Sequence, residues 1–68
     1  MEEKVMLPHQ QRVVDEMNDL GIKITSLGKF FNTDTFNSLA LIDQDLMFKQ
    51  LEYMSNYYKI LQDRIKRF

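Results

Sequence analysis

The sequence has no cysteine and no tryptophan, and its 68 residues include one proline, one histidine and two glycines. Without cysteine, the chain can form neither disulfides nor thiolate zinc sites, and a single histidine argues against a structural metal. We therefore expect no metal and no cofactor. Chains this short bury little apolar surface, so self-association is the remaining route to a stable fold.

An excess of charge of one sign is also lacking, because the formal net charge is −1. This balance argues against nucleic acid as a partner, since duplex binders rely on net positive charge. No apolar run approaches the roughly 18 residues that span a bilayer, so we expect no membrane segment. The opening MEEKVML lacks the basic start and apolar core of a signal peptide, which predicts a cytoplasmic protein.

Catalytic motifs are missing as well. A nucleophilic triad needs a base beside its serine or cysteine, and His9 is the only histidine. The serines are not flanked by a G-x-S-x-G motif, and the two glycines do not form a phosphate-binding loop. We therefore predict that the chain is not an enzyme.

Two rows of apolar residues are present, and both repeat at alternating spacings of three and four residues. The first row consists of Val13, Met17, Leu20, Ile24, Leu27 and Phe31. The second row consists of Met47, Leu51, Met54, Tyr58, Leu61, Ile65 and Phe68. This period of about 3.5 residues is the seam of a coiled coil, so we call the two rows the seams. We expect Leu51 and Leu61 to be core residues.

The seams predict an all-α fold in which residues 1–68 form one helical-hairpin domain. We expect a first helix over residues 8–31, a connection with a short helical turn over 32–42, and a second helix over 43–67. Pro8 suits a first helical turn, Thr33 or Asp34 could cap the short turn, and Asp43 could cap the second helix. Matched lengths and a short connection favour an antiparallel arrangement. The apolar residues of the connection should cover its closed end: Phe36, Leu39, Leu41 and Ile42.

A further apolar stripe lies beside the second seam. We predict that it forms the interface of a homo-oligomeric helical bundle, because long apolar stripes rarely stay uncovered. The predicted interface residues are Val14, Leu46, Tyr53, Tyr57 and Ile60. The first helix also carries a row of small residues: Asn18, Gly21, Thr25 and Gly28. These residues either tolerate solvent or allow a partner helix or ligand to approach, and we favour the first interpretation.

The stretch PHQQR, residues 8–12, opens the first helix. In an antiparallel hairpin it lies beside the basic end of the second helix, and a helix start favours phosphates. We therefore predict a site for a phosphate-bearing small molecule formed by His9, Gln11, Arg12, Tyr57, Arg64 and Arg67. The alternative is that Lys66 and Arg67 only cap the second helix and that Arg12 only pairs with Glu16 four residues later.

The opening PHQQRVVDE and the ending with Leu61, Arg64, Ile65 and Phe68 resemble a family of short phage-encoded helical proteins. The resemblance covers nearly the whole chain and implies a phage origin. Small phage proteins often bind a host component, and many oppose host defence by blocking a protein or sequestering a nucleotide signal. By this analogy, and with the predicted phosphate site, we expect a non-catalytic anti-defence protein of the host cytoplasm that sequesters an anionic, nucleotide-type ligand. The alternative is an inhibitor or assembly factor that docks a host defence protein or a phage protein through Tyr53, Tyr57 and Ile60.

Overall fold

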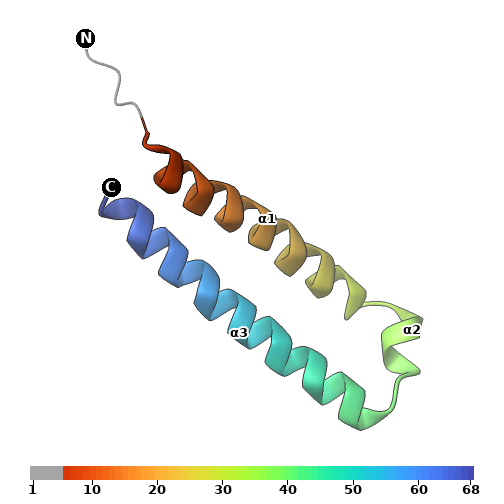
Figure 1. Ribbon diagram of the computed structural model, residues 1–68. Helices are drawn as coiled ribbons and strands as arrows, with labels where there is room; N and C mark the ends of the chain where they lie inside the picture. The colour runs from red at the N-terminus through yellow and green to blue at the C-terminus, as the bar shows by residue number, and fades with distance from the viewer. Residues whose placement is uncertain (1–5) are drawn as a thin grey trace.

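The computed structural model describes residues 6–68, and all regular structure in that range is helical. Helix α1 spans Pro8–Phe30, α2 spans Asp34–Asn37 and α3 spans Leu41–Lys66. Figure 1 shows α1 and α3 antiparallel and side by side, with α2 at one end and the start of α1 and the end of α3 at the other. The prediction of an all-α fold with two long packed helices is confirmed. The expected lack of a signal peptide falls largely on residues 1–5, outside the described residues.

Helix α1 begins without a serine, threonine or aspartate cap. The Leu7 carbonyl accepts hydrogen bonds from the backbone N–H groups of Gln10 and Gln11, at 2.9 and 3.0 Å. In return, the Leu7 N–H donates to the Gln10 side-chain oxygen at 3.0 Å. Pro8, as the first helical residue, has no N–H that needs a partner. The first amides of PHQQR therefore establish the helix start itself.

Helix α3 begins earlier than the sequence predicted. Its N-cap is Ala40, and the Ala40 carbonyl already accepts from the N–H groups of Asp43 and Gln44, at 2.9 and 3.1 Å. The prediction that Asp43 is the N-cap is therefore wrong. Asp43 lies in the first turn instead, where its negative charge interacts favourably with the positive end of the helix dipole.

The core lies where the two seams meet. Its most buried members are Val13, Leu20 and Leu61, and Leu61 is 0% exposed. Partly buried residues from both seams surround them: Met17, Ile24, Met54, Tyr58, Ile65 and Phe68. Leu51 is only half-buried and lies outside this cluster, so the core prediction fits Leu61 better than Leu51. The molecule measures 55 × 16 × 16 Å, which is two helices thick, so the outward faces of both helices stay uncovered.

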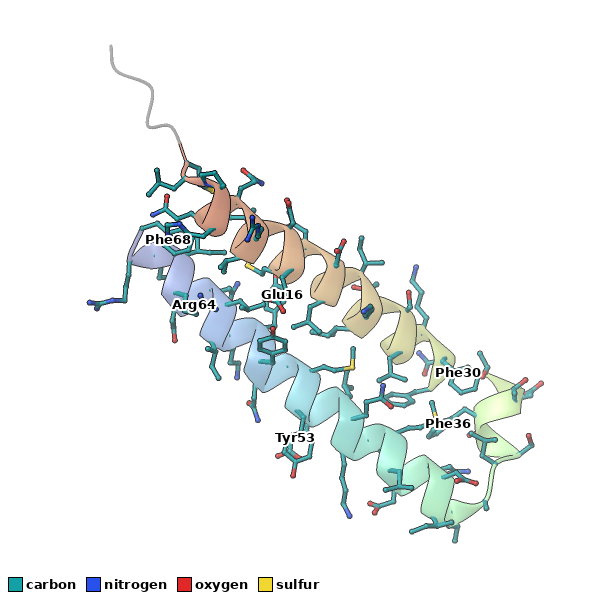
Figure 2. The ribbon with its side chains drawn as sticks, in the orientation of Figure 1. Glu16, Phe30, Phe36, Tyr53, Arg64 and Phe68 are labelled. Atoms are coloured by element: carbon teal, nitrogen blue, oxygen red, sulfur yellow. The ribbon has the colours of Figure 1, made fainter. Side chains whose placement is uncertain are left out.

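An aromatic cluster fills the closed end, where α2 joins the long helices. Phe36 is buried, and its ring lies 6.0, 4.9 and 5.5 Å from those of Phe30, Phe31 and Phe48. Figure 2 shows Phe30 and Phe36 together at this end. These distances between ring centroids are typical of favourable aromatic pairs. Phe36 therefore anchors the short helix between the two long ones.

Polar side chains support the same end. Thr33, one of the two predicted caps, accepts a hydrogen bond from the Phe36 N–H at 3.2 Å. The Gln44 amide donates to the Phe36 and Leu39 carbonyls, at 3.1 and 3.0 Å. These two bonds tie the first turn of α3 to α2 and to the turn between the two helices. The turn is consequently fixed by hydrogen bonds as well as by aromatic packing.

Two residues expected to cover the closed end do not. Leu41 is 81% exposed and Ile42 is 64% exposed, so this part of the prediction is wrong. Both belong to the first turn of α3, which starts at Leu41 rather than at residue 43. On a helix, the residues that share a face with Met47 lie three and seven positions earlier, at Gln44 and Ala40. Leu41 and Ile42 therefore point away from the seam.

Gly21 has a role in packing. The favoured interpretation of the row of small residues, that it only tolerates solvent, did not include this role. A Cβ atom built at Gly21 would lie 3.2 Å from the Tyr58 ring, whereas one built at Gly28 meets nothing within 4 Å. Glycine thus lets Tyr58 of α3 lie close against the α1 backbone. The close approach expected of a partner or ligand is made by a residue of the same chain.

Candidate functional site

A groove of about 660 Å³ runs along one side of the hairpin, between α1 and α3. Helix α1 lines it over three turns, and α3 contributes Tyr57 and Arg64. The α1 residues that line it are Arg12, Val13, Asp15, Glu16, Asp19, Leu20 and Lys23. Val13 and Leu20 form an apolar floor, because both belong to the first seam. Charged side chains of both signs form the walls.

One contact crosses the groove between the two helices. The Tyr57 hydroxyl donates a hydrogen bond to a Glu16 carboxylate oxygen. This bond, together with partial burial and the negative charge of Glu16, raises the pKa of Tyr57 above its usual value, against an opposing effect of Arg64. Figure 2 shows Glu16 on the side of α1 that faces α3. The contact holds the tyrosine ring in place across the groove.

Among the described residues, two of the three carboxylates of the groove have hydrogen-bond partners, whereas its two arginines have none. Asp15 accepts a hydrogen bond from the Gln11 amide at 2.9 Å, and Glu16 is engaged by Tyr57. Within residues 6–68, ion pairs form at Asp45–Lys49 and Asp63–Lys66, and neither involves Arg12 or Arg64. The two guanidinium groups therefore remain available to an anionic ligand.

The structure brings together three of the predicted ligand residues, since Arg12, Tyr57 and Arg64 line this one groove. His9 and Arg67 are exposed at the open end and do not line it. Gln11 reaches the groove only indirectly, through its bond to Asp15. The alternative pairing of Arg12 with Glu16 is not among the ion pairs of residues 6–68, and Glu16 bonds to Tyr57 instead.

Sequence reasoning missed Asp19 and Lys23 as groove residues and treated Glu16 only as a partner for Arg12. A usable signal existed. Glu16 and Tyr57 each directly precede a seam residue, Met17 and Tyr58. In an antiparallel helix pair, such preceding positions on both helices flank the same side of the seam.

The predicted interface residues of α3 are all exposed in the single chain. The exposed fractions are 55% for Leu46, 72% for Tyr53, 40% for Tyr57 and 56% for Ile60. Figure 2 shows Tyr53 on the side of α3 that points away from α1. Val14 of α1 is half-buried. The α3 residues thus form an apolar surface that the hairpin itself does not cover.

Two classes of site are absent from the part of the chain that the structure describes. Residues 6–68 contain no group of three or more histidine, cysteine, aspartate or glutamate side chains arranged to hold a metal ion. In the same range, no helix combines the length and apolar character needed to cross a membrane.

Comparison with known proteins identifies a family for this sequence. A model of the Sequestin family matches residues 7–67, from the residue before α1 to the residue after α3. The chain is also 35% identical over 63 residues to a protein of Enterobacteria phage T4, which covers 93% of this chain and 98% of that relative. The T4 protein is described as an uncharacterized 7.5 kDa protein in the denB-rIIB intergenic region. No solved structure matches the chain significantly. The predicted resemblance to small phage proteins is thereby confirmed, and the chain belongs to the Sequestin family.

Proposed function

We propose that this protein is a non-catalytic phage protein that binds and sequesters an anionic, nucleotide-type ligand in the host cytoplasm and thereby opposes host defence. The observation that carries the proposal is the convergence of Arg12, Tyr57 and Arg64 on one groove, with neither guanidinium paired within residues 6–68. The family name, Sequestin, points in the same direction because it suggests sequestration of a ligand.

The chemistry of the groove suits such a ligand. Arginine forks bind phosphate oxygens in a bidentate manner and stay charged at any physiological pH. The Tyr57 ring offers an aromatic face for a base, and its hydroxyl is already fixed by Glu16. His9, Gln11 and Arg67 surround the open end of the groove and supply further polar and cationic groups, with weaker effects expected because they do not line it.

Sequestration is also consistent with the size of the protein. A chain of 68 residues has little room for catalytic machinery, and a stoichiometric binder needs only one competent surface. We propose that the functional form is a homo-oligomer, because the hairpin leaves Leu46, Tyr53 and Ile60 exposed on α3. An oligomer would present several grooves and cover that apolar surface.

The test is a thermal-shift and calorimetric screen of the whole protein against inorganic phosphate and a panel of mono-, di- and cyclic nucleotides. We expect at least one phosphate compound to stabilise the protein, with an affinity that falls as salt rises. Arg12→Ala and Arg64→Ala should each weaken binding by about tenfold or more, equivalent to about 1.4 kcal/mol. Both side chains are exposed, so the melting temperature of the free protein should change little.

Lys29→Ala is the matched control, because Lys29 is an exposed cation in the last turn of α1, at the closed end. It should leave ligand affinity unchanged. Arg67→Ala separates the groove from the open end: a larger loss than for Arg12→Ala would move the site to the chain termini. The absence of stabilisation by any phosphate compound would overturn the proposal.

A second candidate function uses the exposed face of Tyr53, Tyr57 and Ile60 to dock a host or phage protein and inhibit or assemble it. The exposure of this face in the single chain favours the idea. The oligomeric state of the free protein distinguishes the two functions. A folded monomer at micromolar concentration would favour protein docking, whereas self-association would occupy the face.

A further inference from the structure

Helix α3 carries a second heptad row in addition to its seam. The row, which we call the outer stripe, consists of Leu46, Gln50, Tyr53, Tyr57, Ile60 and Arg64. Its members are spaced 4, 3, 4, 3 and 4 residues apart, as the seam residues are. A helix with two such rows is built to pack against neighbours on two sides, yet within the hairpin α3 has one long neighbour.

The apolar members of the outer stripe are exposed and evenly placed. Leu46 and Ile60 lie seven residues to either side of Tyr53, so all three point in nearly the same direction. From Leu46 to Arg64 the stripe extends about 27 Å along the helix. A partner that covers all three residues must therefore be an elongated surface aligned with α3.

The charges of α3 are separated along its length. Its first half carries Asp43, Asp45 and Glu52 against Lys49, and its last turns carry Lys59, Arg64, Lys66 and Arg67 against Asp63. A second α3 in antiparallel orientation would place the acidic half of each helix against the basic half of the other. A parallel partner would place like charges together, which is unfavourable.

We propose that the outer stripe is the docking surface for a second copy of this chain, with the two α3 helices antiparallel and their two-fold axis near Tyr53. This register pairs Leu46 of each copy with Ile60 of the other, and any shift along the helix leaves one of them exposed. The interface is isologous, because each copy contributes the same surface. The inference rests on the homo-oligomer of the proposed function and specifies its geometry.

The docking arrangement has a consequence for the groove. Tyr57 and Arg64 belong to both the outer stripe and the groove wall, so the second copy packs along the edge of the groove. Tyr57 is held toward α1 by its bond to Glu16, which turns its hydroxyl away from the second copy. Each groove is therefore bordered by the other subunit, and dimer formation narrows its opening.

Single-cysteine variants test the geometry directly, because the parent chain has no cysteine. Tyr53→Cys should form a disulfide-linked dimer under mild oxidation, since the same residue meets itself at the axis. Leu46→Cys and Ile60→Cys should each fail to cross-link alone and should cross-link when the two proteins are mixed. Ile22→Cys is the control, because Ile22 is exposed on α1 outside the outer stripe.

Sedimentation equilibrium provides the second measurement. The parent should exceed the 8.2 kDa of a single chain at micromolar concentration. Tyr53→Glu should raise the dissociation constant by about tenfold or more, since it places two carboxylates at the axis. Ile22→Glu should leave the dissociation constant unchanged.

The outcomes separate this inference from the proposed function. A monomeric parent, self-cross-linking of Leu46→Cys and Ile60→Cys, or failure of Tyr53→Cys to cross-link would overturn the antiparallel dimer. If a phosphate compound still binds in that case, the sequestration proposal survives without this geometry. The expected cross-links without binding of any phosphate compound would support the dimer and overturn the ligand proposal.

Discussion

The two ends of the hairpin are built from different chemistry. At the closed end, the Phe36 ring lies 4.9 to 6.0 Å from three other phenylalanine rings, and the side chains of Thr33 and Gln44 form hydrogen bonds with the Phe36 backbone. Toward the open end, aliphatic seam residues carry the core, and a groove with two unpaired guanidinium groups lies beside them among residues 6–68. The comparison suggests that the closed end fixes the fold while the open half holds the groups available for a ligand.

The first way to test this contrast is Phe36→Ala. We expect it to lower the free energy of unfolding by about 3–5 kcal/mol, because Phe36 is buried at the centre of the aromatic cluster. Urea denaturation at low temperature provides the measurement. Affinity for any groove ligand, measured in the folded fraction, should stay near the parent value. A loss of affinity without a loss of stability would contradict the assignment of the closed end to structure.

The second test is Leu61→Ala in the open half. Leu61 is fully buried, so its truncation should lower the free energy of unfolding by about 2–5 kcal/mol. Leu51→Ala is the matched control, because Leu51 is only half-buried on the same seam and should cost less. Equal losses for the two variants would mean that the core extends evenly along α3 rather than concentrating at Leu61.

The third test compares the two glycines of α1. Gly28→Ala should raise the free energy of unfolding by about 1 kcal/mol, because alanine favours the helix and its methyl group meets open space. Gly21→Ala should raise it by less, since the new methyl group would press on the Tyr58 ring. Thermal denaturation of both variants measures the difference. A larger gain at Gly21 would show that Tyr58 moves away without cost.

The smallest expected effect concerns the Tyr57–Glu16 contact. The folded-state pKa of Tyr57 is raised above its ordinary value of 10.0, first by this hydrogen bond. The stability that it contributes is therefore fully present below pH 10 and is lost as the pH rises through the raised pKa. Spectrophotometric titration of the parent and of Tyr57→Phe should assign the late titration to Tyr57.

The control for that titration is Glu16→Ala, which removes both the hydrogen-bond acceptor and its negative charge, whereas glutamine would still accept from the Tyr57 hydroxyl. It should return the Tyr57 titration toward pH 10. An unchanged titration in Glu16→Ala would mean that burial, rather than the hydrogen bond across the groove, raises the pKa of Tyr57.

Some features of this protein could be predicted from patterns in the sequence, and others could not. The seam spacings predicted both long helices and their packing face, and Leu61 proved to be the centre of the core. The start of α3 was misplaced because Asp43 is a good cap by type, whereas the backbone turn closes at Ala40. The residue type favoured at an N-cap does not by itself fix where a helix begins. Here the backbone hydrogen bonds to Ala40 decide the start of α3.

The candidate site was predicted in part for a related reason. The antiparallel arrangement followed from helix lengths, so the convergence of Arg12 and Arg64 could be expected before the structure was known. The groove itself runs along the side of the hairpin to Lys23, rather than across its end with His9 and Arg67. The position of the groove depends on how the two helices are rotated about their axes. That rotation is seen in contacts between their side chains, such as the hydrogen bond of Tyr57 to Glu16.

The sequence by itself determined the helices, their seams, their antiparallel pairing and the excess of basic residues at the end of α3. These features follow from local periodicity and connection length, which involve residues close together along the chain. Only the tertiary structure decided that Gly21 accommodates Tyr58, that Gln44 closes the turn and that Glu16 holds Tyr57 across the groove. Each of these contacts joins different helices or the turn between them. Their geometry depends on the packing of whole side chains, which no single stretch of sequence specifies.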